Sequence, residues 1–109
     1  MSVIAGPMTA VKLSGRLDAA GAESIALRFT AGVVAAARPA VVDLAEVGFV
    51  ASMGLRLFIS SARALGQKGH RLALFGAVGM VQEVLVDAAI DQILPITETL
   101  EQAIAAVRA

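Results

Sequence analysis

The chain has no cysteine, no tryptophan, no tyrosine and only one histidine among its 109 residues. Without cysteine there can be no disulfide framework and no thiolate metal site, and a single histidine cannot supply a metal cluster. The absence of tryptophan and tyrosine removes the usual stacking platforms of a nucleic-acid-binding protein, and the formal net charge of zero removes its basic surface. We therefore expect no metal, no other cofactor and no nucleic-acid partner.

Long uninterrupted apolar runs are also missing, although 58% of the residues are hydrophobic. Arg38 and Pro39 interrupt the longest candidate before it reaches the roughly 20 residues that a membrane-spanning helix needs. The N-terminal segment lacks the basic start and apolar core of a signal peptide. These features predict a cytoplasmic protein without membrane insertion. The length favours one domain over residues 1–109, large enough to bury a real core.

Strand and helix patterns alternate along the chain without linkers or repeats. Residues 11–17 alternate as in a strand with one buried face, and residues 40–44 form the apolar run of a strand covered on both faces. The predicted fold is an α/β domain in which a mixed sheet of four to five strands carries about four helices, mainly on one face. The remaining strands are expected just before Gly6, at 72–75 and at 93–96. The first expected helix is capped by Asp18 and ends before Pro39. The others run from Ser52 to a stop at Gly66, from Met80 to Ala88, and onward from a cap at Thr97.

The stretch from Phe49 to Leu55 joins an apolar strand pattern to a new helix. From Leu55 onward the apolar residues have helical spacing, so the pattern predicts that Ser52 is the N-cap. A hydroxyl at this position stands at the positive end of the helix dipole, where an added phosphoryl group is tolerated. From these residues alone, an ordinary capping serine and a phosphorylation switch both remain open.

The side chains around Ser52 bear on these alternatives. Met53 is expected to be exposed and available to a partner, and Leu55 to be buried. Arg56 lies one helical turn after Ser52, where it is either solvated or able to hydrogen-bond to a phosphoryl group. The helix is locally basic, because four cations follow one another in the sequence without an intervening acid. They are Arg56, Arg63, Lys68 and Arg71.

No catalytic constellation is predicted. His70 should lie at the far end of the helix that follows Ser52, so it cannot serve as the base of a serine nucleophile. The spacings Gly66–Gly69 and Gly76–Gly79 lack the Lys-Ser/Thr ending of a phosphate-binding loop. We therefore expect no catalytic residue.

Two ordered motifs resemble one family. Gly15-Arg-Leu-Asp18 resembles a Gly-x-Leu-Asp signature, and Phe49-Val-Ala-Ser-Met-Gly-Leu55 resembles Phe-x-Asp-Ser-x-Gly-Leu. Both signatures are typical of the STAS domain family, in its anti-sigma factor antagonist branch, and the resemblance covers nearly the whole chain. Ser52 occupies the position of the family's phosphorylated serine, whereas Ala51 replaces the aspartate before it.

The resemblance implies a phosphorylation-switched antagonist. Such a domain binds an anti-sigma factor that is also an ATP-dependent serine kinase, and so frees a sigma factor for transcription. Phosphorylation of Ser52 would end the binding, and the ATP would be bound by the partner. The implied partner-binding residues are Gly15, Asp18, Ala51, Ser52, Met53, Gly54 and Arg56.

Two other functions remain open at this point. The first is a constitutive STAS interaction subunit, in a lipid-transport ATPase complex or a signalling scaffold, in which Ser52 is only a cap. Ala51 favours this alternative. The second is a weak nucleotide hydrolase, for which the sequence offers no phosphate loop, no base and no metal cluster. The sequence makes no prediction about the oligomeric state.

Overall fold

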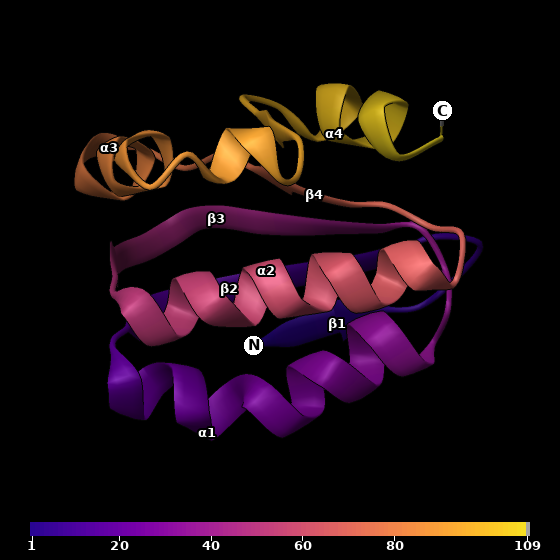
Figure 1. Cartoon of the computed structure of the whole chain (residues 1–109), viewed down its shortest axis with the longest axis horizontal. Coiled ribbons are helices and arrows are strands. Elements are labelled where there is room, and N and C mark those ends of the chain that lie inside the picture. The colour runs from indigo at the N-terminus through magenta and orange to yellow at the C-terminus, as the bar shows by residue number, and fades with distance from the viewer. Residues whose placement is uncertain (109) are drawn as a thin grey trace.

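The structure is a computed structural model in which residues 1–108 are described. Its centre is a five-stranded sheet in the order β1-β2-β3-β4-β5, in which β1 runs antiparallel to β2 and the other neighbours are parallel (Figure 1). The predicted α/β domain with a mixed sheet and four helices is confirmed. The elements are β1 Ser2–Ile4, β2 Thr9–Leu17, α1 Ala19–Thr30, a π-helical turn Ala31–Ala35, β3 Ala40–Val50, α2 Ser52–Gln67, β4 Leu72–Phe75, α3 Gly79–Asp87, a 3-10 turn Ile90–Gln92, β5 Ile96–Thr97 and α4 Leu100–Arg108.

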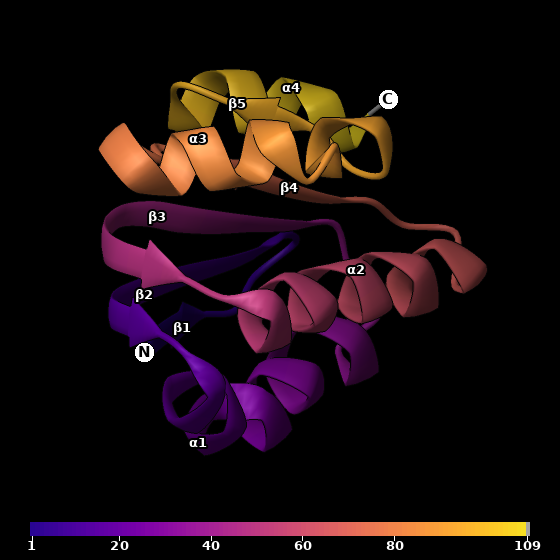
Figure 2. The same cartoon turned by 60° about the vertical axis from the view of Figure 1, so that its left-hand side comes forward.

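The two faces of the sheet carry different cores. On one face Phe29 of α1 and Phe58 of α2 are both fully buried, with ring centroids 6.1 Å apart, and Leu85 of α3 joins the same cluster. On the other face α4 buries Ala103 and Val107 against β3 and β4. Figure 2 shows α3 and α4 on either side of the sheet beside β5. The prediction that the helices lie mainly on one face is therefore confirmed, with α4 on the opposite face.

Strand β3 is longer than the sequence predicted, because its alternation is broken by bulges. Lys12 pairs with Asp43 and Leu17 with Val50, so β3 uses seven residue steps where β2 uses five. The extra residues expose Ala45 and Glu46 in the middle of the strand and hide its period of two. The chain then stays extended up to Val50, directly before the helix of interest.

Two helix ends in the structure differ from the predicted ones by one or two residues. Helix α2 does not end at Gly66 but one residue later, at Gln67; Gly69, two residues beyond that end, has a φ of +85°, and the His70 amide donates to the Leu65 carbonyl at 3.1 Å. Likewise Thr97 is not the cap of α4. The Thr99 hydroxyl accepts from the Gln102 backbone amide at 3.2 Å, and the Gln102 side-chain Oε1 accepts from the Thr99 backbone amide at 3.2 Å.

Two further elements end or begin near a proline, and the second of them differs from the prediction. The first long helix ends before Pro39, as predicted: it stops at Thr30 and continues as the π-helical turn to Ala35. The last strand is Ile96–Thr97, because Pro95 has no amide to donate and contributes only its carbonyl, which accepts from the Leu74 amide at 3.0 Å. This strand lies at an edge of the sheet, as Pro95 predicted.

Candidate functional site

The junction between β3 and α2 is fixed tightly to the end of β2. The Ala51 amide donates to the Leu17 carbonyl at 2.9 Å, so the first turn of α2 starts beside the last residue of β2. Gly54 makes this approach possible, because a methyl group there would lie 3.1 Å from the Leu17 carbonyl oxygen and 3.2 Å from Val50. The carboxyl ends of β2 and β3, together with the first turn of α2, therefore form one surface, which we call the platform. It carries the predicted residues from Ala51 to Arg56.

Ser52 is not the N-cap, which corrects the sequence prediction. Ala51 has the extended conformation of the cap residue, with φ −112° and ψ −176°, and its carbonyl accepts from the Leu55 amide at 3.1 Å. Ser52 is the first helical residue and is exposed. Since alanine has no side-chain acceptor, no side chain among residues 1–108 caps the first-turn amides of α2. An exposed hydroxyl thus stands beside unpaired amides at the positive end of a 16-residue helix.

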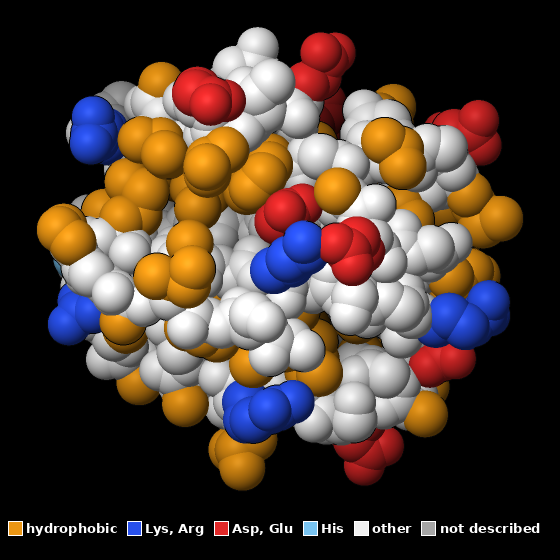
Figure 3. Space-filling model, turned by 180° about the vertical axis from the view of Figure 1, so that it is seen from behind, with side chains coloured by type: hydrophobic (Ala, Val, Ile, Leu, Met, Phe, Trp, Pro, Cys, Tyr) orange, Lys and Arg blue, Asp and Glu red, His pale blue; other side chains and the backbone are white. Residues whose placement is uncertain are grey.

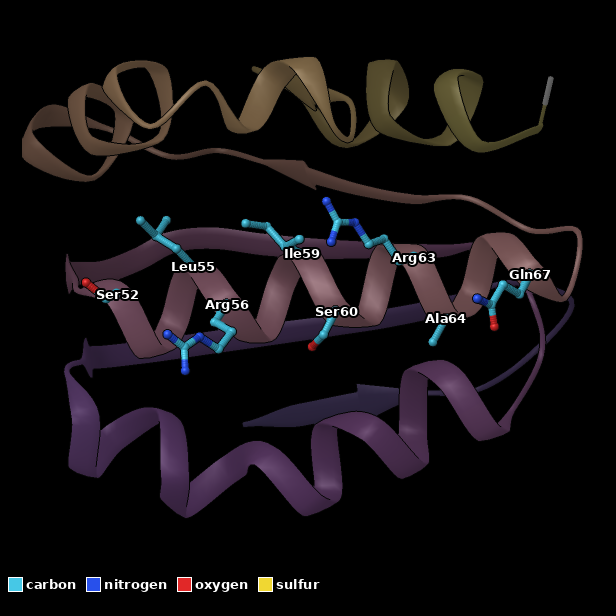
Figure 4. A pocket seen from close by; sticks show the side chains of 8 residues that line it. All are labelled: Ser52, Leu55, Arg56, Ile59, Ser60, Arg63, Ala64 and Gln67. Atoms are coloured by element: carbon cyan, nitrogen blue, oxygen red, sulfur yellow. The ribbon is translucent and has the colours of Figure 1, made fainter.

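A shallow groove of about 490 Å³ runs from Ser52 along the outer side of α2. Figure 4 shows Leu55, Ile59 and Arg63 along one side of this surface and Arg56 and Ser60 along the other. Helix α2 has no acidic residue, and within residues 1–108 no carboxylate lies in salt-bridge distance of Arg56 or Arg63. The groove lining consists of Ser52, Leu55, Arg56, Ile59, Ser60, Arg63, Ala64 and Gln67.

Met53 lies on the other flank of α2, facing α1. Its side chain is 42% exposed, as the sequence predicted, and it borders a small apolar hollow of about 240 Å³ with Leu57. Leu55 is partly buried against the main core, again as predicted. Helices α1 and α2 lie side by side (Figures 1 and 2), so this hollow continues the exposed surface around Ser52 onto α1.

Asp18 lies at the same platform, and Gly15 lies two residues before the end of β2. The Asp18 carboxylate caps α1, because its Oδ1 accepts from the Gly21 amide at 2.8 Å. Its Oδ2 is 3.7 Å from Nε of Arg16, and the Arg16 guanidinium is 4.4 Å from the centre of the Phe49 ring. Gly15 has a φ of +85°, a conformation that favours glycine, between two register shifts of the β2–β3 pairing.

Sequence reasoning missed Arg16 as part of this platform. Arg16 stands inside the Gly15-Arg-Leu-Asp18 motif, but its neighbour Phe49 is 33 positions away and is brought to it by the register of β2 and β3. The guanidinium over the ring forms a cation–π contact at the carboxyl end of the sheet. The structure therefore brings together Asp18, Arg16, Phe49, Ala51 and Ser52 from two distant motifs.

The described residues offer no metal-binding cluster. Within residues 1–108 no group of three or more histidine, cysteine, aspartate or glutamate side chains is placed to hold a metal ion. His70 lies beyond the C-terminal end of α2, at the far end of the helix from Ser52, as predicted. No helix in the same range is long and apolar enough to cross a membrane.

The comparisons with known proteins fit this geometry. A sequence profile described as "STAS domain" matches residues 2–103. The chain belongs to the STAS domain family. The comparison with curated proteins found no match.

Solved structures of anti-sigma factor antagonists share the fold of this STAS domain. An anti-sigma factor antagonist from Mycobacterium paratuberculosis is 28% identical, with a TM-score of 0.86 over 99% of this chain and 92% of the other. Protein TM1081 of Thermotoga maritima has a TM-score of 0.86 at 18% identity, covering 97% and 92% of the two chains. The Bacillus cell-fate determinant SpoIIAA in its phosphorylated form has a TM-score of 0.69 at 19% identity, covering 95% and 96%.

Proposed function

We propose that this STAS domain is an anti-sigma factor antagonist that is switched off by phosphorylation of Ser52. In the unphosphorylated state it binds an anti-sigma factor with serine kinase activity and thereby releases a sigma factor. Because this exchange of binding partners controls transcription, the domain acts in the cytoplasm in this proposal. The domain itself catalyses nothing in this scheme, since the kinase and its ATP belong to the partner.

The observation that carries this proposal is the exposed Ser52 hydroxyl on the uncapped first turn of α2. A kinase can reach this hydroxyl without unfolding the domain. A phosphoryl group there would stand at the positive end of the helix dipole, among amides that no side chain in residues 1–108 occupies. The likeness to the antagonist from Mycobacterium paratuberculosis, at 28% identity over 99% of this chain, supports the same function.

Phosphorylation would act on binding rather than on folding. The dianion costs the folded domain little at a helix N-terminus, but a partner fitted over Ser52 would have to desolvate it or lose contact with it. The proposed contact surface comprises the platform, the exposed Met53 side chain and the Ser52 end of the groove as far as Arg56. The predicted partner-binding residues are thus Gly15, Asp18, Ala51, Ser52, Met53, Gly54 and Arg56.

A constitutive STAS interaction subunit is the second candidate function, and Ala51 favours it. The aspartate that the resembled motif has at this position would cap α2 and place a carboxylate beside the serine. Without that carboxylate, a kinase that reads it would modify Ser52 slowly. In this alternative the same surface binds its partner permanently, in a transport ATPase complex or a signalling scaffold.

Copurification with matched variants tests the proposal. The wild-type protein, Ser52→Asp, Ser52→Ala and Ser60→Asp would each be used to retain partners from native cytoplasm, followed by mass spectrometry. Ser60 is the control, because it lines the same groove two turns further along α2 and is exposed. We expect wild type, Ser52→Ala and Ser60→Asp to retain an ATP-binding protein kinase that Ser52→Asp loses.

Incubation of the retained kinase with ATP and the wild-type domain then locates the modification. A phosphopeptide containing Ser52, absent from Ser52→Ala, is the expected result. If all four forms retain the same partner and no phosphate appears on Ser52, the switch is wrong and the constitutive subunit stands. Circular dichroism of each variant excludes unfolding as the cause of lost binding.

A further inference from the structure

Strand β1 is an open edge of the sheet. It is the first strand in the order β1-β2-β3-β4-β5, and all three of its residues are exposed. The opposite edge is different, because β5 has two residues and lies between α3 and α4 (Figure 2). Native proteins blunt open edges with charges, prolines or bulges. Strand β1 is short but has none of these, and no charged side chain occurs in residues 1–11.

A row of aliphatic side chains crosses the sheet and ends at this edge. Leu74 pairs with Val42, Val42 with Val11, and Val11 with Val3. The first three are at most 2% exposed, whereas Val3 is 40% exposed. The row is thus buried throughout the sheet and is cut off at its last member. Ile4, which points to the other face of the strand, is 71% exposed.

We propose that β1 pairs with β1 of a second copy of this chain, antiparallel and centred on Val3. A two-fold axis through Val3 places Val3 of the second copy directly opposite, so the aliphatic row runs without interruption through both sheets. The same register places Ile4 of one copy opposite Ser2 of the other, and Ser2 is the neighbour of Lys12. The aliphatic stem of Lys12 can then cover Ile4.

Charge favours a second copy as the occupant of this edge. The chain has a formal net charge of zero, so two copies do not repel each other, and the paired segments have no charged side chains. Lys12, the first charged residue after the edge, is already bonded to Glu46 at 2.6 Å. Seen from behind, the surface of the molecule carries charges of both signs beside a hydrophobic cluster (Figure 3).

The dimer would leave both candidate sites free. Because β1 is antiparallel to β2 and the two β1 strands are antiparallel to each other, the carboxyl ends of the two β2 strands point in opposite directions. The two Ser52 residues therefore lie at opposite ends of the joined sheet. Such a dimer can engage two partner molecules at once. The pairing does not depend on the proposed antagonist function.

Sedimentation velocity over a roughly hundredfold concentration range tests the dimer. We expect the mass of the wild-type species to double towards high concentration, and Val3→Lys and Val3→Asp to stay monomeric because like charges meet at the axis. An equimolar mixture of the two variants should dimerise again. Val86→Lys is the control, since Val86 is 52% exposed on α3, which lies beside β5 at the opposite edge of the sheet (Figure 2); it should dimerise as wild type does.

A single cysteine gives an independent test, because the natural chain has none. Residues opposite each other in an antiparallel pair have Cα atoms about 4.5–5.5 Å apart, within the range that a disulfide spans. Val3→Cys should cross-link to a dimer under mild oxidation about tenfold faster than Val86→Cys on α3. A wild-type protein that stays monomeric, or equal cross-linking of the two cysteine variants, would overturn the inference whether or not Ser52 is phosphorylated.

Discussion

Helices α1 and α2 begin in nearly the same way, at neighbouring strands of the sheet, but only one of them is capped. Each follows the carboxyl end of a strand and has a glycine at its third residue, Gly21 or Gly54. The residue before α1 is Asp18, whose carboxylate bonds to the Gly21 amide, whereas the residue before α2 is Ala51, which bonds to no amide through its side chain. The uncapped start is the one that carries the exposed serine. The difference separates a helix start that serves stability from one whose amides are left available.

The largest loss of stability is expected when a methyl group is added at Gly21 of α1, and a smaller loss when it is added at Gly54 of α2. At Gly21 it would lie 2.0 Å from the Arg16 carbonyl oxygen, so the backbone must shift; at Gly54 its tightest contacts are 3.1 Å. We expect Gly21→Ala to lower the free energy of unfolding by about 3 kcal/mol and Gly54→Ala by about 1–2 kcal/mol, measured by urea unfolding.

Gly66→Ala is the matched control for these substitutions. Gly66 is also helical, but a methyl group there meets nothing within 4 Å. It should therefore raise the free energy of unfolding by about 0.5–1 kcal/mol, because alanine loses less backbone entropy. Equal losses at Gly21 and Gly66 would show that the close approach of α1 to β2 is not what requires glycine.

Removal of the existing cap tests the α1 side of the comparison. Asp18→Ala deletes the acceptor of the Gly21 amide and the carboxylate beside Arg16. The expected loss in the free energy of unfolding is about 0.5–2 kcal/mol, again from urea unfolding. Asp18→Asn, which keeps an acceptor oxygen, should recover most of that loss. If Asp18→Asn were as unstable as Asp18→Ala, the side-chain oxygen of residue 18 would not be acting as the cap of α1.

Addition of the missing cap tests the α2 side, with the opposite sign. Ala51 already has the extended cap conformation, so Ala51→Asp can place a carboxylate over the free amides without moving the backbone. We expect the free energy of unfolding to rise by about 0.5–1 kcal/mol. Ala51→Val should give no gain, since valine has no acceptor. A loss of stability on Ala51→Asp would mean that the first-turn amides are not accessible.

The smallest effect is expected at Ser52 itself. Ser52→Asp puts a negative charge on the first turn and should raise the free energy of unfolding by about 0.3–1 kcal/mol, less in high salt. Ser52→Ala should change it by less than about 0.5 kcal/mol, because the Ser52 side chain makes no hydrogen bond to residues 1–108. Thermal and urea unfolding at two salt concentrations measure both. A larger loss for Ser52→Ala would restore Ser52 as a structural cap.

The predicted cap at Ser52, which the structure places at Ala51, shows where sequence reasoning reached its limit. The pattern located the strand, the helix and the serine within one residue, but it chose the residue with a capping side chain as the cap. In the structure the cap lies one residue earlier, at Ala51. The Ala51 amide is held by Leu17 of the neighbouring strand, and this bond fixes Ala51 in the extended conformation of a cap residue. Thr97 was misjudged for a similar reason, since Thr99 and Gln102 bond reciprocally.

The sequence by itself determined the α/β class, the locally basic helix and the serine at its start, because apolar periodicity and residue chemistry act over a few neighbouring residues. It also determined what the chain lacks: cysteine and a second histidine. Only the tertiary structure decided the bulged register of β2 and β3, the contact of Arg16 with Phe49, and the open edge at Val3. These depend on strands far apart in the chain meeting in one particular alignment, and no local pattern specifies that alignment.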